Sequence, residues 1–109
     1  MSKVKDNIHF LRFIASASTV KQRQSVLRTA SKEQVFAIAE VVANLLEGNI
    51  PISDAALKVI RIYRKHLRRL GTNERNKLSW IKRKESAVKA SKAIAILLKE
   101  FGYIWGPEL

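Results

Sequence analysis

Cysteine is absent from this chain of 109 residues, and histidine is almost absent, since His9 and His66 are the only two. Without thiols there are no disulfide bonds and no thiolate metal sites, which excludes the small secreted domains that disulfides hold together. The sequence also has no glycine-rich phosphate loop, no nucleophile motif and no carboxylate spacing suited to acid–base catalysis. We therefore expect a protein that is not an enzyme and has no metal, cofactor or small-molecule substrate.

Long apolar runs are missing as well. The longest nearly apolar run, from Ala93 to Leu98, is far shorter than the roughly 20 residues that cross a bilayer. The first apolar stretch, residues 8–17, is interrupted by His9 and Arg12, unlike the apolar centre of a signal peptide. We therefore expect an intracellular protein. Peripheral binding to an anionic membrane surface is a third and less favoured function.

The few prolines and glycines lie where helices are expected to end. There are two prolines and four glycines, among them Gly48, Pro51, Gly71 and Gly102. No segment alternates apolar and polar residues for long enough to indicate a strand. The pattern predicts one all-α domain over residues 1–109, a compact bundle of about five helices. These are expected near 7–17, 19–28, 32–47, 54–70 and 73–101, the last with a break near residues 84–86.

The third of these helices has the clearest start. Ser31 and Gln34 have the spacing of a capping box, in which each side chain bonds the backbone N–H of the other. Apolar residues then cover most of the circumference of the helix up to Gly48. A helix that is apolar on most sides belongs in the middle of a fold. We expect this helix to form the core.

Charge of one sign dominates the composition. The chain has 21 Lys and Arg against 9 Asp and Glu, a net charge of +12. Residues 58–84 alone contain eleven Lys and Arg and one acid, Glu74. A foldable chain with this much positive charge is typical of proteins that bind a polyanion, most commonly nucleic acid. The alternative is a basic domain that is merely well solvated.

The geometry of a helix over residues 54–70 favours the polyanion. If this segment is one helix, six cations fall within an arc of roughly 140°, opposite its apolar face. No acid lies between Lys58 and Leu70, whereas solvated helix faces usually mix charges. A row of Lys and Arg without Asn or Gln suits phosphates rather than base edges. The predicted phosphate contacts are Lys58, Arg61, Arg64, Lys65, Arg68 and Arg69.

A second basic cluster would extend this row to residue 84, so that the basic helical segment spans residues 53–84. It contains Trp80, which either stacks on a base or, as is more common for a helical tryptophan, belongs to the core. The further predicted phosphate contacts in this cluster are Lys77, Lys82, Arg83 and Lys84.

The last part of the chain, residues 85–109, has balanced charge and combines an apolar helix with an aromatic tail. One interpretation is that the tail folds back over the core. The other is that it docks on a partner or a second copy of the chain, because a short chain does not always bury this much apolar surface. The residues of this predicted partner site are Phe101, Tyr103, Ile104 and Trp105.

Residues 31–80 resemble a known family of short basic proteins. The segments that carry the resemblance begin at Ser31-Lys-Glu-Gln and continue with Asn44-Leu-Leu-Glu-Gly-Asn-Ile-Pro-Ile-Ser53 and Tyr63-Arg-Lys-His-Leu-Arg-Arg-Leu70. They are similar to proteins encoded by adenovirus-like elements of animals, the Polinton (Maverick) and adintovirus group, which are often compared with the DNA-condensing core protein of adenovirus virions. The resemblance implies a viral or mobile-element origin, a role in the virion or in genome packaging, and DNA rather than RNA as the ligand. The basic run Lys82-Arg83-Lys84 has the composition of a nuclear localisation signal, so the expected place is the nucleus or the virion.

The first functional hypothesis is therefore a protein that binds and condenses nucleic acid without sequence specificity, of the virion-core or genome-packaging type. The alternative is a helical protein-interaction module, associated with a capsid or acting as an adaptor. That module would use the basic face and the aromatic tail.

Overall fold

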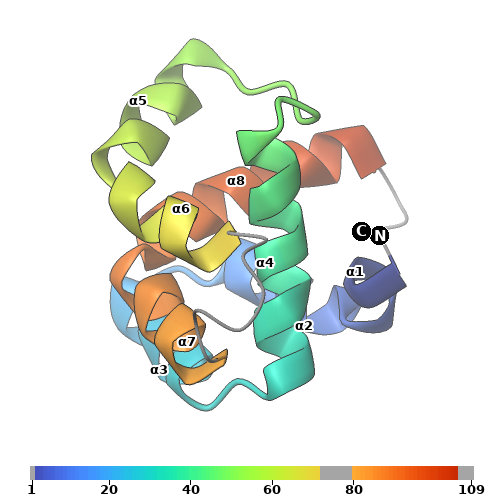
Figure 1. The fold of residues 1–109 in the computed structure, drawn as a ribbon, viewed down its shortest axis with the longest axis vertical. Helices are drawn as coiled ribbons and strands as arrows, with labels where there is room; N and C mark the ends of the chain where they lie inside the picture. The colour runs from blue at the N-terminus through green and yellow to red at the C-terminus, as the bar shows by residue number, and fades with distance from the viewer. Residues whose placement is uncertain (1, 72–79, 106–109) are drawn as a thin grey trace.

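Helices make up nearly all of the part of the chain that the computed structural model describes, residues 2–71 and 80–105 (Figure 1). The side chains of Ser2 and residues 103–105 are outside the description. The all-α prediction is confirmed, but these described residues form eight helices where about five were expected. They are α1 Ser2–Asp6, α2 Ile8–Ser16, α3 Val20–Arg28, α4 Lys32–Leu46, α5 Asp54–Ile62, α6 Arg64–Gly71, α7 Trp80–Lys89 and α8 Ser91–Trp105.

Local capping explains where α3 and α4 begin. At α4 the predicted capping box is confirmed: the Gln34 N–H donates to Ser31 Oγ at 3.1 Å, and the Ser31 N–H donates to Gln34 Oε1 at 2.9 Å. At α3 the cap is Thr19, whose Oγ1 accepts from the Gln22 N–H at 3.1 Å. Ser18, which directly precedes the predicted helix over residues 19–28 and would be its cap on sequence grounds, instead donates its hydroxyl to the Gln22 side-chain oxygen. Each cap satisfies an N–H that has no partner within the helix.

The predicted start of the first helix, near residue 7, is wrong. The chain is already helical from Ser2, and α1 and α2 are separated at Asn7, the residue before α2. The Asn7 side chain makes no capping hydrogen bond to α2. Its amide instead donates to the Lys3 carbonyl in α1, at 2.8 Å. Asp6, which directly precedes the predicted helix over residues 7–17 and would be its cap on sequence grounds, is instead the last residue of α1.

The fourth predicted helix is divided at Tyr63. Its start is as expected, with Ser53 Oγ accepting from the Ala56 N–H at 3.2 Å. The Tyr63 N–H bonds three residues back to Ile60, and its φ and ψ of −105° and 14° leave the helical range. The division has a reason in packing, because α5 lies against α8 whereas α6 lies against α4 and α7.

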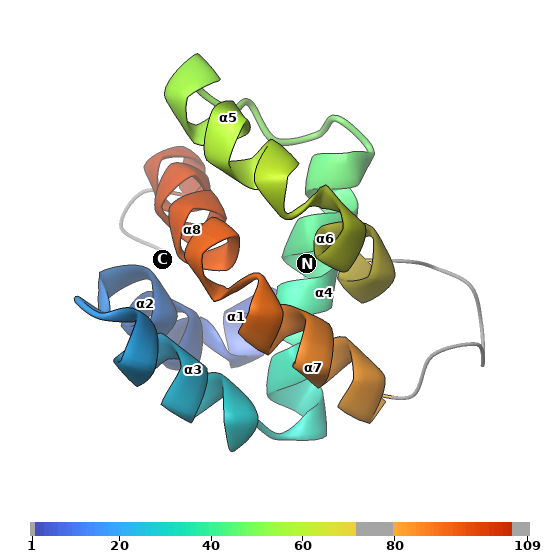
Figure 2. The ribbon, with the colours of Figure 1, turned by 90° about the vertical axis from the view of Figure 1, so that its left-hand side faces the viewer.

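The last predicted helix is divided too, but at Ala90 rather than near residues 84–86. Here α7 packs on α3, α4 and α6, and α8 turns away to pack mainly on α2 and α5 (Figure 2). The expected end at Gly102 is wrong as well, since α8 continues to Trp105.

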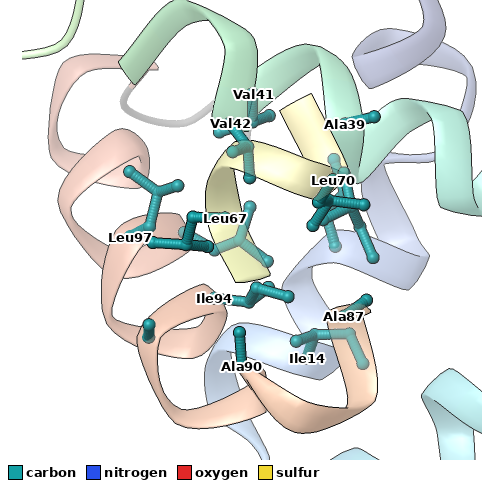
Figure 3. Packing of buried hydrophobic residues seen from close by; sticks show 14 of the residues in the cluster. Ile14, Ala39, Val41, Val42, Leu67, Leu70, Ala87, Ala90, Ile94 and Leu97 are labelled. Carbon is teal, nitrogen blue, oxygen red and sulfur yellow. The ribbon is translucent and has the colours of Figure 1, made fainter. Parts of the chain in front are cut away.

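One cluster of apolar side chains joins these helices. Figure 3 shows side chains of α2, α4, α6, α7 and α8 meeting there, among them the labelled Val42, Leu67 and Ile94. As predicted, α4 is central: it packs against α1, α6, α7 and α8. Within residues 2–71 and 80–105, no helix is both long enough and apolar enough to cross a membrane.

Candidate nucleic-acid interface

The densest group of exposed cations lies on α6. Its inner side is apolar, with Leu67 and Leu70 fully buried against α4 and α7. At 100° per residue its four cations span an arc of about 140° on the opposite side. All four of these predicted phosphate contacts are exposed: Arg64, Lys65, Arg68 and Arg69.

The other two cations of the predicted row, Lys58 and Arg61, are also exposed but belong to α5. The prediction of one continuous row on a single helix is therefore wrong, because the chain changes direction at Tyr63. What the structure presents is a basic surface on two short helices that meet at this residue (Figure 2). We call it the α5–α6 surface, defined by these six cations.

Among the described residues, no acid neutralises the cations of the α5–α6 surface. In the described part of the chain, no carboxylate forms an ion pair, within 4.0 Å, with any of the six. The only acid on either helix is Asp54, in the first turn of α5. Like charges held together in this way destabilise the folded state until counterions or a polyanion relieve them.

The surroundings of His66 show that a seventh cation, Lys89, lies beside the α5–α6 surface. Partial burial is the first cause that lowers the pKa of His66, and the charges of Lys89, Lys65 and Arg69 lower it further. Lys89 is the last residue of α7, which packs on α6. This packing brings the charge of Lys89 close enough to act on His66. Sequence reasoning missed Lys89 because it belongs to a segment of balanced charge, and only the packing of α7 on α6 brings it there.

Arg83 is a correction to the predicted site. Its side chain is only 9% exposed, and its guanidinium donates from Nη1 to the Leu70 carbonyl at 2.8 Å, near the end of α6. The same guanidinium lies 5.6 Å from the centre of the Phe36 ring. Arg83 therefore ties α7 to α6 and α4 and does not face a ligand.

Lys84 is partly committed to the fold. Its ammonium donates to the Arg28 carbonyl at 3.0 Å, at the end of α3, and lies 4.8 Å from the centre of the Trp80 ring. A cation is favourable there because helix carbonyls without partners concentrate at the C-terminus. Lys82 is exposed on α7. Lys77 lies outside the described residues.

The predicted partner site in the tail is only partly described. Phe101 is 1% exposed and belongs to the apolar cluster, which agrees with the interpretation that the tail covers the core. It is not available to dock a partner in this conformation. The side chains of the other three, Tyr103, Ile104 and Trp105, lie outside the description.

No group of three or more His, Asp or Glu side chains that could hold a metal ion occurs among the residues that the structure places. No protein-family model, curated protein or solved structure matches the chain.

Proposed function

We propose that this protein is a non-enzymatic nucleic-acid-binding protein that contacts the phosphate backbone without reading sequence. The observation that carries the proposal is the α5–α6 surface: six exposed cations on adjoining helices, with no acidic partner among the described residues and with Lys89 of α7 beside them.

The chemistry of this surface suits phosphates. A guanidinium donates two parallel hydrogen bonds to a phosphate, and four of the six cations are arginines. Residues 54–71 contain no Asn or Gln, the side chains that commonly read adenine. Binding by charge alone releases counterions, so the affinity should fall steeply with salt and vary little with sequence.

The resemblance of residues 31–80 to the Polinton and adintovirus proteins supports duplex DNA as the ligand and genome packaging in a virion core as the setting. Origin and setting rest on that resemblance, whereas phosphate binding rests on the charges and their exposure.

The experiment compares two variants with equal loss of charge. In R64Q/R68Q both changes lie on α6. In the control, K5Q/K32Q, the changes lie on exposed positions of α1 and α4. Affinity is measured for a labelled random duplex over a series of salt concentrations. The slope of log affinity against log salt is negative, and in the α6 variant its magnitude should fall by about 2, because each lost phosphate contact removes about 0.9. The control should keep the wild-type slope.

Equal slopes for wild type and the α6 variant would contradict the proposal. The alternative, a basic face that binds an acidic protein, is tested by competition. If polyglutamate displaces the protein at a lower charge concentration than random duplex does, the surface suits acidic peptides better than nucleic acid.

A further inference from the structure

A groove of about 580 Å³ lies between α3 and α7, which run side by side in both views (Figures 1 and 2). Its apolar wall is formed by Trp80, Ile81 and Val88, which share one side of α7. Ile81 is 53% exposed, although burying an isoleucine is favourable. Around these apolar side chains stand charged and polar residues of both helices: Gln24, Arg28, Lys84, Glu85 and Lys89.

The groove contains a polar group in a fixed place. The Lys84 ammonium is held by the Arg28 carbonyl at 3.0 Å and lies over the Trp80 ring at 4.8 Å. An ammonium has three N–H donors, and this hydrogen bond uses one of them. An apolar wall with a few positioned donors is the usual composition of a site for a flat organic group.

This groove adjoins the α5–α6 surface. Lys89 lines the groove, and the same Lys89 lies close enough to α6 to act on His66. A strand whose phosphates contact α6 and Lys89 would therefore pass the mouth of the groove. The cations of the lining outnumber Glu85, so charge alone does not exclude a phosphate. The aliphatic part of the apolar wall offers a phosphate no hydrogen-bond donor, whereas the flat face of a base buries apolar surface against it.

We propose that the groove between α3 and α7 receives an unpaired base of a single-stranded nucleic acid, against Trp80, Ile81 and Val88, with the Lys84 ammonium donating to an acceptor atom of the base, a carbonyl oxygen or a ring nitrogen. The proposal rests on the proposed function and adds a preference to it. Bases of an intact duplex are stacked and paired and cannot enter, so a single strand gains a contact that a duplex lacks. Every base has a flat apolar face, so this contact tolerates any sequence.

The first experiment uses the unmodified protein and two single strands of equal length, oligo-dT and the same strand with all bases removed. Both carry the same phosphates, so a surface that contacts only phosphates binds them equally. The proposal expects oligo-dT to bind about 5- to 150-fold more tightly, the range that stacking of a base on an aromatic side chain supplies. The indole N–H signal of Trp80, assigned with W105F, should move with oligo-dT and not with the abasic strand.

A pair of matched variants locates the contact. Ile81 and Ile62 are both exposed isoleucines, the second 75% exposed at the end of α5 on the basic surface. Ile81→Asp should bring the ratio of the two affinities close to one. Ile62→Asp should weaken both strands alike through charge repulsion and leave the ratio unchanged.

Two failures are distinguishable. Equal affinity of the wild-type protein for the normal and abasic strands, with steep salt dependence for both, overturns the groove and leaves the proposed function standing. Absence of binding to either strand and to duplex at low salt overturns both. An unchanged Trp80 signal in the bound complex also overturns the base site.

Discussion

At Gly71 the last turn of α6 lies directly on α4. A Cβ atom built on this glycine would be 2.9 Å from Val42 Cγ1 and 3.1 Å from the Ala43 backbone nitrogen. A backbone atom cannot move aside as a flexible side chain can, so Gly71→Ala should lower the free energy of unfolding by about 1–3 kcal/mol. Urea denaturation measures the loss.

Gly48 provides the contrast, because it has open space around the Cβ position but a φ of +78°. Gly48→Ala should cost about 1–2 kcal/mol through backbone strain alone, and Gly48→Asn should cost less, since asparagine tolerates this region. If Gly71→Ala stabilises the protein instead, α6 does not approach α4 as closely as the structure shows.

His66 allows a prediction about pH. Burial and the charges of Lys89, Lys65 and Arg69 lower its pKa from 6.5, so the folded protein holds the proton less tightly than the unfolded chain does. The contribution of His66 to stability is therefore complete above pH 6.5 and is lost as the pH falls through 6.5 towards the lower folded pKa. His66→Gln should flatten the pH dependence of urea denaturation in this window.

Phosphates bound at the α5–α6 surface would oppose the three lysine and arginine charges around His66. Duplex DNA should therefore raise the pKa of His66, and the protein should take up a proton on binding. An NMR titration of the imidazole with and without duplex measures this change, with the His9 signal as the internal reference. A pKa of His66 that is the same in the complex would place the phosphates elsewhere.

At the scale of the helices, two cations of α7 have different expected roles: Arg83 stabilises the packing of α7, whereas Lys89 is expected to contact phosphates. Arg83 joins α7 to the end of α6 through the Leu70 carbonyl, whereas Lys89 is exposed beside His66. Arg83→Met should cost about 1–3 kcal/mol of stability, because a charge-assisted hydrogen bond is lost and a buried carbonyl is left without its donor. It should leave the salt slope of duplex binding unchanged.

Lys89→Met is the matched control and should show the reverse. Its stability should be unchanged, and the magnitude of its salt slope for duplex binding should fall by about 0.9. Urea denaturation and the salt titration are run on both variants. A reduced slope in Arg83→Met, with stability preserved, would return Arg83 to the binding surface.

The helices also show which elements a sequence can predict. The start of α4 depends on Ser31 and Gln34, three residues apart, so local chemistry sufficed. The breaks at Tyr63 and Ala90 carry no glycine or proline signal, since both residues are compatible with a helix. They follow from packing on different neighbours, which no local pattern encodes. For the same reason Arg83 and Lys82, adjacent in sequence, could not be assigned to the core and the surface in advance.

At the scale of the whole molecule, composition gives the net charge but does not give the positions of the cations on the surface. The excess in residues 58–84 correctly predicted exposed cations at Lys58, Arg61 and on α6. The packing of α7 then removed Arg83 from the surface and added Lys89 from the segment of balanced charge. The basic surface therefore excludes part of the predicted basic segment, but it extends over α5, α6 and the end of α7 instead of one face of a single helix.

The proposed condensation of DNA should depend on the net charge of the whole molecule rather than on the α5–α6 surface. At low salt, complexes lose their net charge and associate when phosphates match the +12 of the protein, so light scattering should peak at about twelve phosphates per molecule. R64E/R68E and K5E/K32E each lower the net charge by four, and both should move the peak to about eight phosphates. Only R64E/R68E should also weaken binding strongly, because only it reverses charges on α6. A peak that moves in R64E/R68E but stays near twelve phosphates in K5E/K32E would mean that condensation depends on the α5–α6 surface and not on net charge.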